Sequence, residues 1–267
     1  HIYNMLLDEW SPAETTGTDP GERMTHAVAM DPARSKMYVF GGHMMYSLSN
    51  ELLVLDTDTM TWSLLYDGME GGPPPIMGAS MVFDPSQETL HIVGGQGYYG
   101  LNDEVWSYDT LTGEWSSHVI DEGEGPIAVG MTAAWDESVG QAVFFGGQGY
   151  GRLLEESWCF DGEYFERATH LGDPLPPAVG GAGAMAPEHG GMLITGGESY
   201  YTLVDTVYLA QTSDGCIMNI HALESGEDAP APVTGAAMAW HARDHQAFLV
   251  GGWTYYALSE SLTGISL

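Results

Sequence analysis

A short apolar run that ends in two consecutive glycines occurs five times in this chain of 267 residues. The pairs are Gly41-Gly42, Gly94-Gly95, Gly146-Gly147, Gly196-Gly197 and Gly251-Gly252, at intervals of 53, 52, 50 and 55 residues. Such a regular period is typical of a repeat architecture, in which each unit buries its apolar face against its neighbours. The spacing therefore predicts five units of one kind along the whole chain.

The second unit shows what one repeat contains. A stretch of small and apolar residues, Gly78–Asp84, is followed by the apolar run Leu90–Val93, which leads into the glycine pair. Two further stretches, Glu104–Asp109 and Gly113–Val119, alternate polar and apolar residues. Short runs of this composition between Gly, Pro and Asp residues indicate β-strands, and no segment sustains helical spacing for three turns. Each unit is therefore predicted to be a small four-stranded sheet.

The fifth unit has three predicted strands, and the N-terminal segment offers a fourth. In Tyr3–Ser11, Trp10 stands where the first two units have Trp62 and Trp115, and a similar acidic linker follows. We expect this strand to complete the last sheet, which would close a ring without an open edge. The alternative is that the chain is a piece of a larger ring. Because the chain starts at His1 rather than at Met, we also expect an upstream segment to have been removed.

The units resemble the kelch repeat, which has a double glycine, an Asn/Asp-containing turn, a Tyr-Asp pair and a later Trp. The second unit carries all four parts: Gly94-Gly95, Asn102-Asp103, Tyr108-Asp109 and Trp115. The first unit has Gly41-Gly42, Asn50-Glu51, Leu55-Asp56 and Trp62. The third has Phe160-Asp161 and Phe165 in the last two places, and the fourth and fifth keep little beyond the glycines.

This resemblance covers essentially the whole chain and implies an all-β fold, a kelch-type β-propeller with five four-stranded blades. Residues 1–267 would form one domain, with the last blade closed by the N-terminal strand. The expected blades are 24–66, 78–120, 130–169, 182–222 and 235–267 together with 3–11. The resemblance does not imply one function, because kelch propellers serve as adaptors, lectin-like modules and enzyme domains.

The charge balance limits the partners. The chain has 37 Asp and Glu residues against six Lys and Arg residues, and its formal net charge is −31. Nucleic acids and anionic membranes need basic contacts, so neither is an expected partner, and no run of 18 apolar residues suggests membrane insertion. The acidity fits a highly soluble surface or adaptation to high salt, where ions screen self-repulsion. We expect an extracellular site, or a cell or virion surface.

The sequence has two cysteines, Cys159 and Cys216, in neighbouring units. They form either a disulfide between two blades or two buried free thiols.

Two sets of connections emerge on the same face of a propeller, and both are unusual here. The loops between the second and third strands carry aromatic residues in one register, mostly as Tyr-Tyr pairs. Aromatic side chains bury large areas, so we expect the second ring of each pair to pack between blades and the first to be exposed. The linkers between blades are acidic and rich in Pro and Gly: Glu14–Glu22, Asp67–Pro75, Asp121–Pro126, Gly172–Pro177 and Glu224–Pro232.

Tyrosines beside carboxylates suit sugar faces by stacking, or Lys and Arg side chains by cation–π attraction. The candidate ligand-binding residues are Tyr46, Tyr98, Tyr99, Tyr150, Tyr200, Tyr201, Tyr255, Tyr256, Trp253, Arg152 and Glu198. We therefore predict a binding module that presents this acidic, Tyr-rich face to a carbohydrate or protein partner, within a larger assembly. The alternatives are a carbohydrate-active enzyme, such as a lyase, oxidase or epimerase, and a purely structural module.

Signals for catalysis and for metals are weaker, and no catalytic or metal-binding residue is assigned. His241 and His245 are four residues apart, but in a strand-to-turn segment rather than on a helix, which disfavours zinc. No cofactor is predicted; calcium on the acidic loops is the alternative, although the nearest motif, Asp56-Thr-Asp58, is better explained by turn capping. Small residues recur in the strand nearest the axis, which predicts a narrow centre and a ligand on the face: Ala27, Ala79, Thr132, Gly183 and Ala237.

Overall fold

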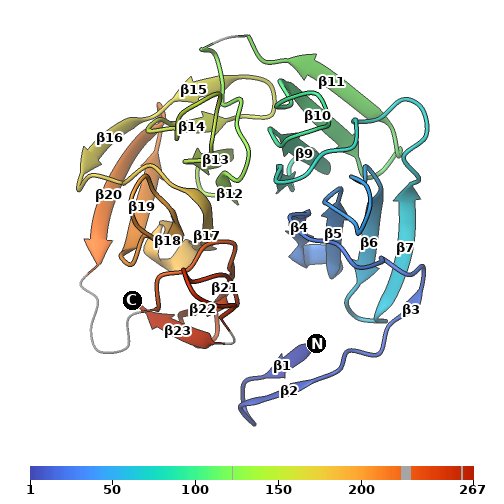
Figure 1. Ribbon diagram of the computed structural model, residues 1–267, viewed down its shortest axis with the longest axis horizontal. Helices are drawn as coiled ribbons and strands as arrows, with labels where there is room; N and C mark the ends of the chain where they lie inside the picture. Colours follow the sequence, from blue (N-terminus) through green and yellow to red (C-terminus); the bar gives the residue numbers. More distant parts are fainter. Residues whose placement is uncertain (122, 224–229, 260) are drawn as a thin grey trace.

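The computed structural model describes residues 1–121, 123–223, 230–259 and 261–267. Its sheets are arranged as five blades around a central axis (Figure 1), which confirms the predicted five-bladed β-propeller. Besides strands, the described residues contain only two short 3-10 helices, η1 (Pro32–Arg34) and η2 (Pro187–His189). Parts of three predicted segments, the linkers 121–126 and 224–232 and the last blade, lie outside the described residues.

The blades are antiparallel meanders in which the first strand is innermost. Blade 1 has β4 (Ala27–Asp31), β5 (Lys36–Phe40), β6 (Leu52–Asp56) and β7 (Thr61–Tyr66). Blade 2 has β8 (Ser80–Asp84), β9 (Thr89–Val93), β10 (Glu104–Asp109) and β11 (Trp115–Val119). Blade 3 has β12 (Thr132–Asp136), β13 (Gln141–Phe145), β14 (Ser157–Phe160) and β15 (Phe165–Arg167). Blade 4 has β17 (Val179–Ala186), β18 (Gly191–Glu198), β19 (Val207–Ser213) and β20 (Ile217–Leu223).

Two linkers add a parallel strand to the outer edge of a blade. These strands are β3 (Thr16–Gly17), which pairs with β7, and β16 (Thr169–Gly172), which pairs with β20. Each covers an edge that would otherwise present unpaired backbone groups.

The expected closure of the last blade by the N-terminal strand is wrong. Blade 5 contains three strands, β21 (Ala237–His241), β22 (Gln246–Val250) and β23 (Leu262–Ser266). The N-terminal segment holds two strands rather than one, because β1 (Ile2–Asn4) pairs with β2 (Glu9–Ser11), with Tyr3 opposite Trp10. A hairpin between adjacent segments has a small loop-closure cost. The hairpin approaches blade 5 through side chains, since the Tyr3 and Phe248 rings are 6.4 Å apart.

The double glycines form the seams between blades. At each of the first four, the second glycine donates its N–H to a carbonyl of the next linker: Gly42 to Ile76, Gly95 to Ala128, Gly147 to Ala178 and Gly197 to Val233, at 2.7–2.9 Å. The first glycine has a positive φ, and a Cβ on Gly146 would lie 2.2 Å from the Ala178 carbonyl oxygen. A side chain there would hold the linker away from the sheet, so this approach requires glycine.

Aromatic residues of the repeat fill the space between neighbouring sheets. The Trp115 ring of blade 2 lies 5.6 Å from the Tyr66 ring and 6.1 Å from the Phe40 ring, both in blade 1.

The Asp of the Tyr-Asp pair caps the following turn, where Asp109 Oδ1 accepts hydrogen bonds from Leu111 and Thr112. Asp56 does the same for Asp58 and Thr59, which confirms the capping interpretation of Asp56-Thr-Asp58.

The two cysteines form a disulfide that joins blades 3 and 4. Cys159 lies on β14, and Cys216 lies in the turn before β20. Both residues are buried, 1 % and 0 % exposed, in a cluster with Met192, Met218 and Ile220. Of the two alternatives left open by the sequence, the structure shows the cross-blade disulfide.

Candidate functional site: the tyrosine loop face

The aromatic loops between the second and third strands project from one face, which we call the loop face. Each of these loops has two adjacent positions for aromatic residues, and in blades 1, 2, 4 and 5 the second position holds a tyrosine. These second tyrosines are almost fully exposed. Their exposed fractions are at least 91 %: Tyr46, Tyr99, Tyr201 and Tyr256. These residues hold four large, amphipathic side chains in solvent on one face. The expectation that the second tyrosine packs between blades is therefore wrong.

In blades 2, 3 and 4 the first tyrosine of the register contacts the preceding blade instead. The Tyr98 hydroxyl accepts a hydrogen bond from the backbone N–H of Leu48 at 2.7 Å, and the Tyr200 hydroxyl accepts one from Leu153 at 3.3 Å. Tyr150 follows the same pattern, because a Cβ on Gly100 would lie 3.2 Å from its hydroxyl. These tyrosines remain more than half exposed, but they also tie neighbouring loops together. Their first role is therefore structural.

The other predicted binding residues occupy separate places on this face. Glu198 and Trp253 stand directly after the glycine pairs of blades 4 and 5 and are exposed. Trp253 forms isolated β-bridges with Thr234 and Leu258, which hold its backbone at the base of the loop. Tyr255 precedes Tyr256 in the same loop and is 58 % exposed. The structure thus gathers the candidates on one face rather than into one pocket.

Arg152 belongs to a pocket at the edge of the loop face. Both of its terminal nitrogens lie 3.0 Å from the carboxylate oxygens of Glu156, and Arg167 Nη2 lies 3.1 Å from Glu156 Oε1. The Glu156 carboxylate raises the pKa of Arg152, and hydrogen bonding to Arg152 lowers the pKa of Glu156 to about 2. The pocket measures about 250 Å³ and is also lined by Tyr150, Leu154 and Trp158.

A second cavity, which the sequence reasoning missed, lies at the opposite end of the inner strands. It measures about 650 Å³ and is lined by large apolar residues: Met30, Met81, Trp135, Met185, Met238 and Trp240. The prediction of a narrow centre is wrong there. Along this strand Ala27 and Ala29 are buried in the core cluster, although Ala29 also reaches the cavity, while Val28 and Met30 alternate with them, are exposed and line the cavity. This period of two along the first strands was the signal that could have revealed it.

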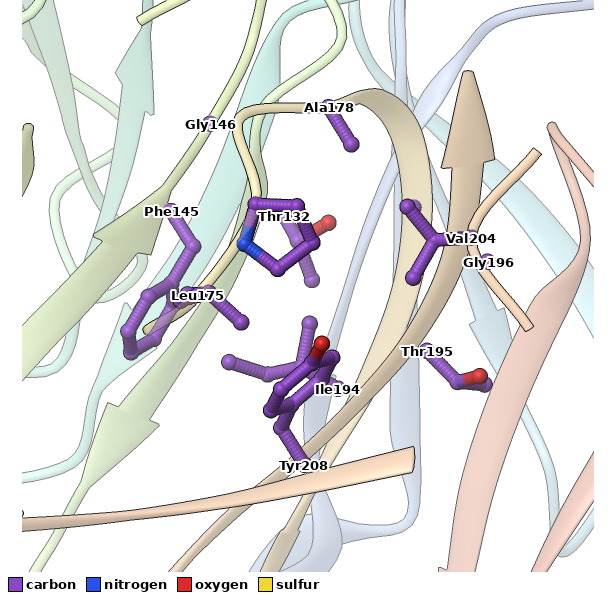
Figure 2. Close-up of a pocket in the computed structure, with 12 residues that line it drawn as sticks. Thr132, Phe145, Gly146, Leu175, Ala178, Ile194, Thr195, Gly196, Val204 and Tyr208 are labelled. Atoms are coloured by element: carbon purple, nitrogen blue, oxygen red, sulfur yellow. The ribbon is translucent and has the colours of Figure 1, made fainter. Parts of the chain in front are cut away.

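The seam between blades 3 and 4 holds a further cavity of about 20 Å³ (Figure 2). Phe145 and Gly146 line it from blade 3, Tyr208 lines it from blade 4, and Leu175 and Ala178 line it from the linker. It has room for about one water molecule. It is therefore a packing gap in the seam and too small for a ligand.

His91 is buried inside the propeller, at 2 % exposure between blades 2 and 3. Its Nδ1 lies 2.9 Å from the Ser107 hydroxyl, and its ring packs against Phe160 and Trp135. Burial lowers its pKa from 6.5 to about 4, although the charge of Asp84 acts in the opposite direction. The imidazole is therefore neutral in the folded protein near neutral pH.

Acid is expected to destabilise the protein through His91. Between pH 6.5 and about pH 4 the unfolded chain binds a proton at this site and the folded chain does not, so the free energy of unfolding falls as the pH drops. A shift of this size corresponds to about 3 kcal/mol. Urea unfolding across this range should show a shallower pH dependence in His91→Gln than in the wild type. The exposed His221→Gln control should keep the wild-type slope; equal slopes in all three proteins would contradict this role.

A metal-binding cluster and a membrane-spanning helix are both absent from the described part of the chain. No three His, Cys, Asp or Glu side chains converge there in a way that could hold a metal ion. Over the same residues, no helix has the length and apolar character needed to cross a bilayer.

Comparison with known families matches residues 1–166 to the KLHDC2/KLHL20/DRC7 Kelch-repeats domain. The chain belongs to the kelch-repeat family. This confirms the resemblance carried by the glycine pairs, the Tyr-Asp pairs and the tryptophans. Kelch propellers generally act as protein-interaction modules.

The similar curated proteins have diverse names. An N-(sulfonatooxy)prop-2-enimidothioate sulfolyase from Thlaspi arvense is 32 % identical over 46 % of this chain and 35 % of its own length. Acyl-CoA-binding domain-containing protein 6 from Oryza sativa subsp. japonica is 27 % identical over 73 % of this chain and 30 % of its own length. Kelch domain-containing protein 3 from Bos taurus is 28 % identical over 43 % of this chain and 32 % of its own length. The matches span about a third of each relative, so they bear on the kelch repeats alone.

Proposed function

We propose that this kelch propeller is a protein-interaction module whose loop face binds a partner through exposed Lys or Arg side chains. The observation that carries the proposal is the set of almost fully exposed tyrosines Tyr46, Tyr99, Tyr201 and Tyr256. An exposed tyrosine face attracts a cation held over it. Aromatic residues are also the side chains that contribute most to binding at protein interfaces.

The charge around these tyrosines favours the same class of partner. Asp67, Asp121 and Asp173 in the linkers are exposed, and the chain as a whole carries a net charge of −31. Arg23 offers nothing to an acidic ligand, because its side chain is 4 % exposed and pairs with Glu51 at 3.0 Å. A partner with a basic surface therefore gains from both the tyrosines and the long-range field.

Removing the exposed tyrosines together tests this proposal. The probe is a labelled peptide of alternating Arg and Gly residues, with a Gln-Gly peptide as the neutral reference. In Tyr99→Ala/Tyr201→Ala/Tyr256→Ala the net charge is unchanged, so any loss of affinity reports the aromatic contacts. We expect at least about tenfold weaker binding of the Arg-Gly peptide, since each cation–π contact contributes about 0.5–1 kcal/mol.

The matched control is Tyr164→Ala, which removes a 68 % exposed tyrosine in the turn between β14 and β15, at the other end of the strands. This variant should bind like the wild type. If the triple variant also binds like the wild type, the peptide is held by charge alone and the loop-face assignment fails. Tyr98 and Tyr200 are left in place, because their hydroxyls bond to neighbouring loops.

An extracellular setting remains part of the proposal. The buried disulfide between Cys159 and Cys216 supports it, since such bonds persist in oxidising compartments.

Among the similar proteins named above, the enzyme alternative is favoured by the name of the sulfolyase relative. In the described part of the chain, no histidine lines the pocket that contains Arg152 and Glu156.

A further inference from the structure

The distribution of positive charge is uneven in this acidic protein. In most ion pairs of the described Lys and Arg side chains, one basic side chain faces one or two carboxylates. Arg23 pairs with Glu51 and Lys36 with Asp56, while Arg34 pairs with both Asp31 and Glu88. The pocket beside Tyr150 reverses this ratio, because two guanidinium groups, those of Arg152 and Arg167, share the single carboxylate of Glu156. The triad of these three paired side chains therefore carries one positive charge in excess, while the neighbouring Glu155 carboxylate acts on Arg152 by its charge without forming an ion pair with it.

Hydrogen bonding within the triad leaves donors available. Glu156 accepts two bonds from Arg152, one from Arg167 and one from the backbone N–H of Glu155, so its oxygens are fully used. Each guanidinium has five N–H donors in a fixed fork. Arg152 Nη1 also donates to the Leu153 carbonyl at 3.5 Å, which leaves donors unused on both guanidinium groups. The Arg152 and Arg167 side chains are 52 % and 58 % exposed. Such forks match the geometry of a second carboxylate.

The walls of the pocket hold the arginines in place and offer a surface for a ring. Arg167 lies over the buried Trp158, with its Cζ 5.4 Å from the ring centroid. Ile127 and Leu154 provide apolar walls, and Tyr150 stands at the edge with 74 % of its surface exposed. A volume of about 250 Å³ is near the lower end of the range for small-ligand pockets, about 300–1,000 Å³. The space therefore suits a single ring rather than a long chain.

We propose that this pocket binds the carboxylate of an acidic sugar, with the sugar ring packed against Tyr150. The carboxylate accepts hydrogen bonds from the free donors of Arg152 and Arg167. The strongly acidic surroundings repel anions at long range, but at about 0.15 M salt the Debye length is about 8 Å, so this repulsion is largely screened at the pocket. This site is independent of the basic partner proposed for the tyrosines, so either proposal can fail alone.

Glucuronate and glucose are the matched probes, measured by ligand-observed NMR and calorimetry at about 0.15 M NaCl. They differ in the carboxylate and share the ring. We expect glucuronate to bind and glucose to bind at least about tenfold more weakly. A glucuronate-containing disaccharide that binds more tightly than the free acid would assign a polysaccharide as the source. Equal affinities would assign a free sugar acid.

Three variants of the triad and one control variant separate ligand binding from a purely structural ion pair. Arg152→Gln and Arg167→Gln should each weaken glucuronate binding about tenfold. Glu156→Gln should tighten it several-fold, because it removes the competing carboxylate and its charge. Arg34→Gln, which removes an arginine shared by Asp31 and Glu88, should leave binding unchanged.

Melting curves of each variant must first show a folded protein. Glucuronate that binds no better than glucose to the wild type would overturn the proposal. So would Arg152→Gln and Arg167→Gln variants that are folded and bind like Arg34→Gln. If Arg152, Arg167 and Glu156 have only a structural role, Glu156→Gln should lower the melting temperature without any gain in glucuronate affinity. That result would also contradict a binding site.

Discussion

Gly146→Ala is expected to destabilise the propeller by about 3–5 kcal/mol. The residue has a φ of +62°, and its new Cβ would lie 2.2 Å from the carbonyl oxygen of Ala178. Relief of that clash moves the linker away and breaks the 2.7 Å hydrogen bond from the Gly147 N–H to Ala178. Figure 2 shows Gly146 and Ala178 at the same seam between blades 3 and 4. Urea unfolding of the two proteins measures the difference.

The fifth glycine pair provides an internal control for this prediction. Gly251 has a φ of +72°, but no described residue has an atom within 4 Å of a Cβ built on it. Gly251→Ala therefore carries only the backbone cost of a left-handed conformation, about 1–2 kcal/mol. Equal losses in Gly146→Ala and Gly251→Ala would show that the left-handed backbone conformation alone, rather than the seam between blades, requires these glycines.

Loss of the disulfide is the second large effect. Cys159→Ala/Cys216→Ala is expected to lower the free energy of unfolding by about 4 kcal/mol, because the bond closes a loop of 57 residues in the unfolded chain. The removed sulfur atoms also leave a gap in the cluster with Met192 and Met218, which adds to the loss. Urea unfolding without reductant compares this variant with the wild type.

Thiol titration of the unfolded wild-type chain provides a separate measurement. Without reductant it should find no free thiol, and after reduction it should find both. Two free thiols before reduction would contradict the bond. An unchanged urea midpoint in the double variant would show that the bond adds no stability.

The repeat pattern predicted much of the fold because the physical causes are local. Alternating short strands and a glycine pair every 50 to 55 residues are enough to predict small sheets that stack on one another. The turn-capping role of Asp56 was also predictable, since an aspartate in this position bonds to backbone N–H groups two and three residues later. Such interactions involve neighbours in sequence.

Other features could not be predicted because they depend on distances between blades. Tyr98 is exposed as expected, but Tyr99 is fully exposed instead of packed between blades. The contact between blades is made by Tyr98, since only the packed blades place its hydroxyl 2.7 Å from the Leu48 N–H. The N-terminal closure was wrong for a related reason. Trp10 has the position of a fourth-strand tryptophan in the repeat, but its backbone partner is Tyr3 in the same segment.

The candidate site also has one part that the sequence predicted and one part that it did not. The sequence alone was sufficient to place tyrosines in one register on the loops, and so to predict a loop face. It also named Arg152, but nothing in the linear order joins it to Arg167, which is 15 residues away on the outer strand of the blade. The pairing of both arginines with Glu156 follows from the side-by-side packing of the loop and β15.

By itself, the sequence determined the repeat unit, the number of blades and the strong negative charge, because period and composition are properties of the linear chain. Only the tertiary structure decided which tyrosines reach solvent, that Cys159 and Cys216 pair, and that two arginines converge on one carboxylate. Each of these depends on how neighbouring strands, loops and blades come together, and close packing sets those positions to within a few ångströms.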